Sequence, residues 1–232
     1  MSLVSSTSSD YIVLFTIGLF IFFSFFTTLV NLYKKNTKYN NHVKNKEILL
    51  IEEAGEEGER YVASMLSTIP KSYLINSFTF ENDKGYSSNI DHLLINSAGI
   101  FVVETKANKG RIVGSPEKDT WTVYKNNSQK KELANPIMQN YSHLNHLKKL
   151  MGNNAPKMYS LIIFPFADIS EVKKYKICNC GSARGFIESR MKYGKYDNYK
   201  VLEIYKKLVD IRNTYGISLD KHIDNINKMN RF

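Results

Sequence analysis

An uncharged stretch from Tyr11 to Val30 constrains the organisation of this chain more than any other feature. It consists of apolar and aromatic residues, interrupted only by threonines, one serine and one glycine. At a rise of ~1.5 Å per residue, a helix of this length crosses the ~30 Å hydrocarbon core of a bilayer. A helix that is apolar all round and is followed by a polar segment has little to pack against in a soluble domain. We therefore expect residues 1–33 to form a transmembrane anchor.

A cleaved signal peptide is the alternative for this stretch. The preceding segment has no Lys or Arg and ends in Asp10, and no small-residue cleavage site follows Val30, so a retained anchor is favoured. Lysines follow the stretch at positions 34, 35, 38, 44 and 46. The positive-inside rule then predicts a single-pass cell-membrane protein with its N-terminus outside and its C-terminal domain in the cytoplasm. Residues 34–46 are expected to be a basic juxtamembrane tether.

Length and charge limit the nature of the segment beyond the tether. A chain of 232 residues allows one domain with its own core plus an attached segment. The formal net charge is +10, and the only charged residue among the first 33 is Asp10, so the charge belongs to the remainder. Such an excess suits a polyanionic partner, either nucleic acid or an anionic membrane surface. A general richness in Lys, Asn, Ile and Tyr explains it equally well, so charge alone does not identify the partner.

The two cysteines, Cys178 and Cys180, are separated by one residue. They are too few for a disulfide framework, and no second Cys or His pair at ligand spacing completes a structural zinc site. This usage is typical of a reducing compartment.

Periodicity predicts helices packed on a sheet. Apolar residues recur at helical spacing from Ile48 to Ile69, and Gly55 and Gly58 interrupt the pattern, so either the helix starts there or another backbone approaches closely. Strands are expected over 73–80, 89–95, 100–105, 111–114, 121–124 and 158–164, and helices over 137–150, 201–215 and 219–229. Residues 167–198 show only weak periodicity. The order helix, strands, helix, strand predicts a mixed α/β fold with one sheet.

A short connection, Asn96 to Gly99, predicts a hairpin and its register. Counting outward from the turn places Asp91 opposite Glu104. Two carboxylates facing each other across strands at ~5 Å destabilise a sheet, and a hard divalent cation such as Mg²⁺ would compensate them. Lys106 lies on the same face as Glu104 and could orient a metal-bound water or neutralise charge on a phosphate. A solvated ion triad without catalysis, worth ~1 kcal/mol or less, is the alternative.

Several motifs in order resemble the nuclease-related domain (NERD) family. They cover roughly residues 53–164 and are Gly55-x-x-Gly58-Glu59, Asn89-Ile90-Asp91-His92, the run from Gly99 to Lys106, Gly110, Trp121, and Asn135-Pro136-x-x-Gln139. That family is regarded as a branch of the PD-(D/E)xK nuclease superfamily. The resemblance implies a restriction-endonuclease-like mixed sheet flanked by helices, and hydrolysis of phosphodiester bonds.

The resemblance also implies roles for particular residues. Asp91 and Glu104 would bind Mg²⁺ or Mn²⁺, with the carbonyl of Thr105 as a third ligand. Lys106 would be the base that positions the attacking water, and Gln139 would contact phosphate or support the ligands.

Two glutamates of the first helix and one histidine lie within the motifs that resemble this family. Glu59 would reach toward the metal from its helix, with Glu56 as a substitute, although a glutamate on a helix surface is the simpler interpretation of either. His92 should point away from Asp91 and pack in the interior.

These inferences define the expected domains and activity. Residues 47–166 would form the nuclease-related domain, and residues 167–232 a mostly helical extension that packs on it. The cluster Arg184, Arg190 and Lys192 in that extension is either a phosphate-contact patch or a solvated face. The expected function is a membrane-anchored, metal-dependent nuclease that acts on nucleic acid, with DNA as the first expectation. The alternative is a non-catalytic, membrane-tethered module that binds nucleic acid or protein and retains the nuclease fold.

Overall fold

The computed structural model describes residues 27, 30–35, 37, 52–81, 87–125, 129–172 and 177–229. The chain separates into two compact units, Met1–Glu53 and Ala54–Phe232. Most of the expected anchor and tether lies outside the described residues, and residues 30–35 within it are helical. In the part that the structure describes, no helix is both long and apolar enough to cross a bilayer. The anchor and its orientation therefore stay predictions.

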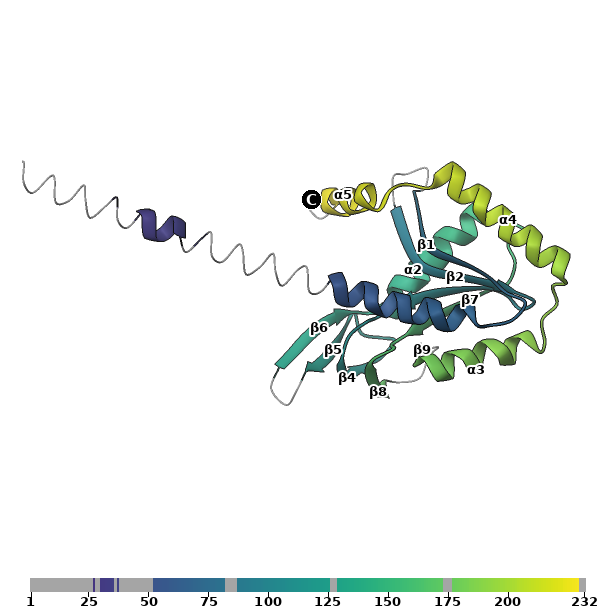
Figure 1. The fold of residues 1–232 in the computed structure, drawn as a ribbon, viewed down its shortest axis with the longest axis horizontal. Helices are drawn as coiled ribbons and strands as arrows, with labels where there is room; N and C mark the ends of the chain where they lie inside the picture. Colours follow the sequence, from purple (N-terminus) through teal and green to yellow (C-terminus); the bar gives the residue numbers. More distant parts are fainter. Residues whose placement is uncertain are drawn as a thin grey trace, which may run out of the picture. The chain divides into compact units, whose positions relative to one another are not determined.

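The larger unit is a mixed α/β structure with two mixed sheets (Figure 1). The first sheet has the order β1-β2-β3-β7-β9, in which β1 to β3 are antiparallel and β3, β7 and β9 are parallel. Its strands are β1 (Tyr73–Glu81), β2 (Ser87–Asn96), β3 (Gly99–Thr105), β7 (Met158–Ile163) and β9 (Ile177–Cys178). The second sheet has the order β6-β5-β4-β8, with strands β4 (Gly110–Gly114), β5 (Thr120–Lys125), β6 (Gln129–Ala134) and β8 (Ala167–Val172).

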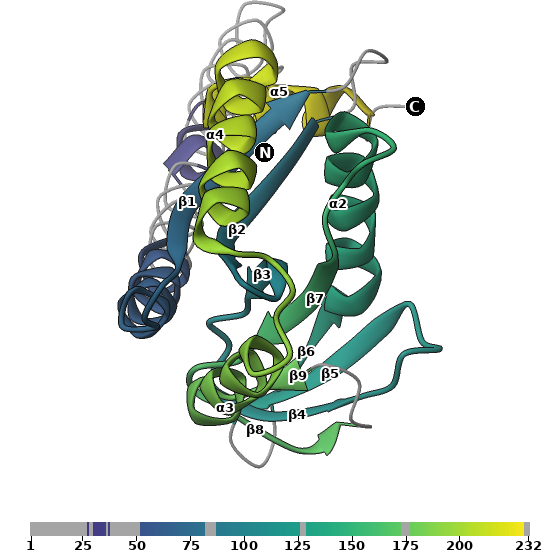
Figure 2. The same cartoon turned by 90° about the vertical axis from the view of Figure 1, so that its right-hand side faces the viewer.

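Helices cover both faces of the first sheet. They are a helix over residues 52–67, α2 (Pro136–Met151), α3 (Cys180–Met191), α4 (Asn198–Tyr215) and α5 (Leu219–Met229). Alternate residues of each strand point to opposite faces, which produces two buried clusters. Leu93, Ile95 and Val102 pack against α2 and α4, which both run along this sheet in Figure 2. Leu94 and Phe101 pack on the other face against the 52–67 helix and α3.

The second sheet has a small core of its own at the end of β7. Ile112, Trp121 and Val123 pack with Ile162 of β7 and with Phe164, which follows that strand. The indole N–H of Trp121 donates to the Ser115 carbonyl at 2.9 Å. The two sheets are thus joined by a shared apolar cluster.

Expectation and structure differ in two places. The expected single sheet is two sheets, and β6, β8, β9 and α3 were not predicted. The strand β6, QKKELA, is exposed along most of its length and so lacks the alternation that identifies a half-buried strand. The helix α3 contains two glycines and buries only Ala183 and Ile187, which leaves almost no helical periodicity in its sequence. The other expected strands and helices are confirmed to within a few residues at their ends.

Gly58 is the position where the 52–67 helix crosses the chain that leaves β3. A Cβ at Gly58 would lie 2.5 Å from the Cβ of Ala107, whereas one at Gly55 would meet nothing within 4 Å. Of the two explanations offered for these glycines, close backbone approach is therefore correct for Gly58. The helix already includes residue 52, so it does not start at either glycine.

This contrast predicts opposite effects for the same substitution at two sites in one helix. Gly58→Ala should lower the free energy of unfolding by ~1–3 kcal/mol, because the added methyl overpacks the contact. Gly55→Ala should raise it by up to ~1 kcal/mol, because alanine has the higher helix propensity and space is open. Urea denaturation followed by circular dichroism measures both. Equal effects at the two sites would contradict the close approach.

Candidate functional site

The β2–β3 hairpin has the register that the turn length predicts. Cα partners run from Asn96↔Gly99 at the turn to His92↔Val103. Asp91 and Glu104 occupy the next position, just beyond the last paired residues. There the backbone N–H of Thr105 donates to Oδ2 of the Asp91 side chain at 2.7 Å, and not to a backbone carbonyl of β2.

Strand β2 is irregular at Asp91. The pairing of β1 with β2 passes from Asn76↔His92 to Phe78↔Ile90 and omits the position between them, where Ser77 has a left-handed φ of 49°. Ile90 and Leu93, three residues apart, both pack in the core beneath α2 and α4, which a regular strand with a period of two cannot achieve. An irregularity of this kind re-aims a side chain. Here it accompanies the turn of the Asp91 carboxylate toward the end of β3.

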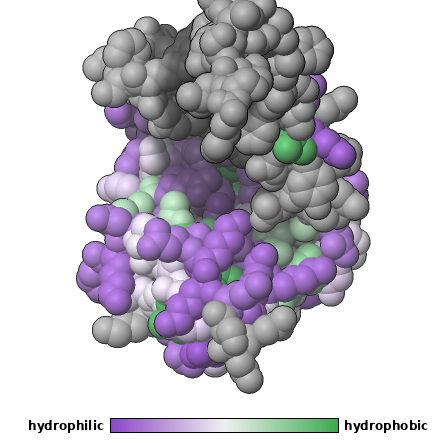
Figure 3. Space-filling view, turned by 90° about the vertical axis from the view of Figure 1, so that its left-hand side faces the viewer, coloured by the Kyte–Doolittle hydropathy of each residue, from purple (hydrophilic) through white to green (hydrophobic). Residues whose placement is uncertain are grey.

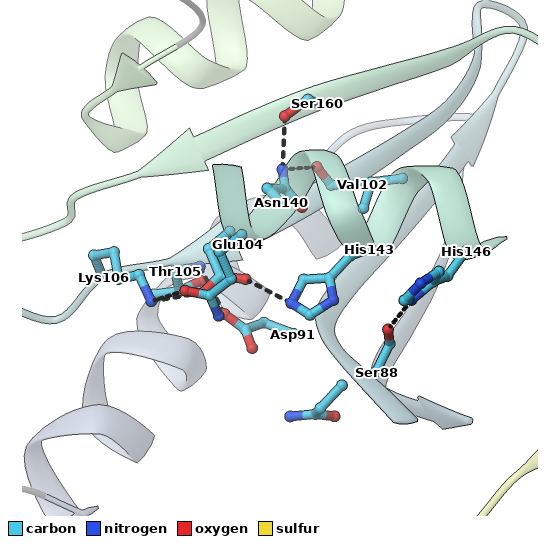
Figure 4. Close-up of polar contacts among 12 residues, drawn as sticks. Ser88, Asp91, Val102, Glu104, Thr105, Lys106, Asn140, His143, His146 and Ser160 are labelled. Carbon is cyan, nitrogen blue, oxygen red and sulfur yellow. Dashed lines mark hydrogen bonds and ion pairs between the residues drawn. The ribbon is translucent and has the colours of Figure 1, made fainter. Parts of the chain in front are cut away.

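Lys106 contacts both Glu104 and Gln139, and Figure 4 shows its ammonium facing the Glu104 carboxylate. The Lys106 Nζ lies 2.7 Å from Oε1 of Glu104 and donates to Oε1 of Gln139 at 2.9 Å. Glu104 is 2 % exposed and Asp91 is 8 % exposed. Two carboxylates from neighbouring strands and an ammonium are therefore held together in a nearly dry environment.

Burial dominates the electrostatics of the acids. It raises the pKa of Asp91 well above its usual range, and the nearby charges of Glu104 and Glu59 raise it further. Burial also raises the pKa of Glu104, while the Lys106 ammonium opposes that shift. Oε2 of Glu104 is buried and has no hydrogen-bond partner. Lys106 offsets one of the two negative charges, so a proton or a further cation is needed to neutralise the other.

Glu59 interacts electrostatically with Asp91 and Glu104 but forms no described hydrogen bond with either of them. It lies half-buried on the 52–67 helix. Its pKa is raised by burial first, then by Glu104 and Glu56, and is lowered by Lys106. Glu56 is exposed and forms an ion pair with Arg60 at 3.3 Å, so the structure favours Glu59 over Glu56 as the helix carboxylate.

His143 is a site residue that sequence reasoning missed. Its Nε2 lies 3.7 Å from Oε2 of Glu104, and both of its ring nitrogens are buried without a hydrogen-bond partner. Burial, followed by the charge of Lys106, lowers the pKa of His143 to about 4, so the ring is neutral. One signal was available, because His143 follows Gln139 by four residues on α2 and so lies on the same helix face.

Asn140 fixes the helix that carries these two residues. Its Nδ2 donates at 2.9 Å to the Val102 carbonyl of β3 and to Oγ of Ser160 on β7 (Figure 4). Six residues further along α2, Nδ1 of His146 lies 2.9 Å from Oγ of Ser88 on β2. These contacts explain why Gln139 and His143 have defined positions over the strand ends.

His92 lies where it was expected. It points to the opposite face of the sheet, where its Nδ1 lies 2.9 Å from Oδ1 of Asn76. Burial lowers the pKa of His92 to about 4. It is a packed interior residue on the far side from Asp91.

The residues at the site fit a Mg²⁺ ion that keeps several waters. This ion is commonly held by one or two carboxylates, with its remaining positions left to water and phosphate, and Oε2 of Glu104 is a buried hard oxygen without a hydrogen-bond partner. Among the described residues, no three His, Cys, Asp or Glu side chains converge so as to hold one metal ion. Glu59 and His143 therefore do not complete a three-side-chain cage with the pair, and the Thr105 carbonyl as a ligand stays a prediction.

The buried groups predict opposing effects of pH on stability. Asp91 and Glu104, whose pKa values are raised in the fold, contribute stability at low pH that is lost as pH rises above about 4. His92 and His143, lowered from 6.5 to about 4, contribute stability above 6.5 that is lost as pH falls toward 4. Asp91→Asn removes the contribution of Asp91, which falls as pH rises. The free energy of unfolding of this variant should therefore rise more steeply between pH 4 and 7 than that of the wild type, as urea denaturation at several pH values can measure. Parallel curves for the two proteins would contradict the raised pKa of Asp91.

Comparison with known proteins gives a family and one relative. The model of the family described as nuclease-related domain matches residues 54–165. A protein from Bacillus anthracis, described as uncharacterized, is 34% identical over 122 residues, which are 51% of this chain and 56% of that protein. The match thus spans little more than half the length of this relative. No solved structure matches the chain.

Proposed function

Because residues 54–165 belong to the nuclease-related domain family, we propose that this chain is a divalent-cation-dependent nuclease that hydrolyses phosphodiester bonds, with DNA as its expected substrate. The observation that carries the proposal is the buried pair Asp91 and Glu104 with Lys106 at 2.7 Å from Glu104. A restriction-endonuclease-like classification of the fold, implied by the motifs, is part of this proposal.

Each residue has a role in that reaction. Asp91 and Glu104, with the Thr105 carbonyl, would hold Mg²⁺ or Mn²⁺, which would activate water and offset charge on the phosphate. Lys106 is held by Glu104 and Gln139, so its ammonium is fixed where it can orient the attacking water and stabilise negative charge. The neutral His143 borders Oε2 of Glu104 at 3.7 Å without a hydrogen bond to it.

The net charge of +10 supports a polyanionic substrate. The face shown in Figure 3 is mostly hydrophilic around a recess, with only scattered hydrophobic areas. Catalysis is tested by incubating the purified full chain with plasmid and with single-stranded DNA, with and without Mg²⁺ or Mn²⁺. Metal-dependent cutting is expected. Intact DNA under every metal condition would refute the enzymatic proposal.

A membrane location is a second part of the proposal, and it depends on the uncharged stretch Tyr11 to Val30. The domain would then work at the cytoplasmic face of the cell membrane. After cell fractionation, the full chain should sediment with membranes and resist extraction by high salt, while a chain lacking residues 1–33 should not. Equal solubility of the two would refute the anchor.

Among the described residues, no three His, Cys, Asp or Glu side chains converge on one ion. This observation favours one competing function, a tethered module that binds nucleic acid or protein without cutting it. Nucleic-acid binding by such a module weakens steeply with salt. It would not change with Asp91→Asn and would need no metal. Binding that meets these conditions, together with absent cleavage, would identify the module.

A further inference from the structure

A second recess lies between the 52–67 helix and α3, on the sheet face away from α2. Its volume is about 310 Å³, and we name it the Tyr61 pocket. It is lined by Tyr61, Ser64, Met65, Thr68, Cys180, Gly181 and Arg184. A volume of this size lies at the lower end of the range for small-molecule sites, so the pocket has room for one small planar group.

An aromatic and cationic cluster stands beside this pocket. The ring of Tyr61 is tilted against that of Phe166 at 5.5 Å between centroids, and Nζ of Lys109 lies 5.6 Å from the centre of the Phe166 ring. Tyr61 is nevertheless 54% exposed. A large ring that is fixed by a neighbour but still open to solvent is suited to stack on a ligand.

The Tyr61 pocket and the candidate site border the same edge of the first sheet. β3 and β7 are parallel, so Lys109 and Phe166, which follow their C-terminal ends, leave the sheet at that edge. Tyr61 lies two residues after Glu59, whose charge interacts with Glu104. Residues two apart on a helix point to different sides of it, so the Tyr61 pocket and the Glu59 carboxylate lie on different sides of the 52–67 helix.

The pocket also contains a cation in a defined position. Arg184 donates from Nε to Glu188 at 2.8 Å and from Nη1 to Oγ1 of Thr68 at 2.7 Å, while its side chain stays 42% exposed. Its guanidinium is therefore held by protein contacts and still accessible to an anion such as phosphate. An exposed aromatic ring, apolar walls and flanking cations are the combination that binds unpaired nucleotides.

We propose that the Tyr61 pocket binds one unstacked nucleotide of a single strand, with its base on Tyr61 and its phosphates near Arg184 and Lys109. This inference rests on the proposed function and names its substrate class. In a duplex each base is stacked on its neighbours, so only an unpaired strand or a frayed end can offer a base to the ring.

The test measures binding to the full chain without divalent cation, so that it does not depend on cutting. The probes are labelled oligodeoxythymidylate and oligouridylate of roughly 15 nucleotides, and a blunt DNA hairpin. Gly181→Leu places an apolar side chain at the pocket wall, where the added Cβ meets only Oδ1 of Asn179 at 3.6 Å. Gly185→Leu is the matched control on the same helix, since a Cβ at Gly185 meets nothing within 4 Å and the residue is exposed.

A second pair of variants tests the ring itself. Tyr61→Ala removes it and Tyr61→Phe retains it. Tyr199→Ala is the control, because Tyr199 is 87% exposed on α4 and lies outside the pocket. Loss of one stacked base corresponds to roughly a tenfold increase in Kd.

We expect Gly181→Leu and Tyr61→Ala to weaken binding of a single strand about tenfold, with Tyr61→Phe and both controls unchanged and the hairpin unaffected. The two probes show whether DNA, RNA or both are accepted. If Gly181→Leu and Tyr61→Ala bound both probes with wild-type affinity, the proposed binding in the Tyr61 pocket would be refuted, and the nuclease proposal would not be affected. Equal weakening in the control variants would refute it as well. A wild type that binds neither probe would also overturn it. Binding as expected without metal-dependent cleavage would instead refute only the hydrolytic function.

Discussion

Asp91→Asn should reduce metal-dependent cleavage by roughly a hundredfold or more, while making the folded chain more stable in the absence of metal. Asparagine keeps an oxygen that can accept from the Thr105 N–H, now bonded at 2.7 Å, so the local geometry is preserved. It removes one of two buried like charges, whose mutual repulsion contributes to the raised pKa of Asp91. A residue that binds the cation costs stability when no cation is present, and the two effects should therefore have opposite signs.

Cleavage rates and urea denaturation of the same protein preparations measure both effects. Asp168→Asn is the matched control, since Asp168 is fully exposed on β8 and bonds only to the neighbouring Ser170 among the described contacts. The control should cut DNA like the wild type. If Asp91→Asn retained cleavage, Asp91 would not be a metal ligand. If it lost both cleavage and stability, a damaged fold would be the simpler explanation.

Lys106→Met should lower the cleavage rate by roughly 10²–10⁴-fold, the range for a positioned group that handles protons or charge at the reacting atoms. Methionine retains most of the length of the side chain but cannot donate to Glu104 or Gln139, which Lys106 contacts at 2.7 and 2.9 Å. Metal binding should persist, or become tighter, because a competing cation has left the Glu104 carboxylate. This separation of cleavage from metal binding distinguishes Lys106 from Asp91.

Lys118→Met serves as the control for charge, because Lys118 is exposed on the β4–β5 connection. Single-turnover cleavage and Mn²⁺ titration of the two variants give the comparison. Unchanged cleavage in Lys106→Met would assign Lys106 a structural role as the partner of Glu104. A similar loss in Lys118→Met would indicate that general electrostatic attraction of DNA, and not a positioned ammonium, limits the rate.

The centre of the site could be predicted because a hairpin register is determined by its turn. Once Asn96 to Gly99 is the connection, the positions of Asp91 and Glu104 are obtained by counting, and the pairs from Asn96↔Gly99 to His92↔Val103 confirm that register. The irregularity opposite Ser77 could not be predicted. A left-handed φ of 49° at a serine is set by its tertiary surroundings and has no signature in the alternation of the strand.

The residues on α2 were predicted only in part. Gln139 was found through its motif, but Asn140 and His143 were missed because an amide and an imidazole on a helix are usually solvated. Their roles depend on the depth at which α2 packs on β3 and β7, shown by the bonds of Asn140 to Val102 and Ser160. The helix α3, which forms one wall of the Tyr61 pocket, was missed for the different reason that its glycines hide its periodicity.

The proposed nuclease activity requires that Asp91 and Glu104 together hold a divalent cation. Titration of Mn²⁺ into the full chain without nucleic acid, followed by calorimetry at neutral pH, tests this requirement without depending on cleavage. We expect a binding site in the wild type and in Lys106→Met that disappears in Asp91→Asn and in Glu104→Gln. Mn²⁺ binding that is absent from the wild type, or unchanged in the two carboxylate variants, would contradict it.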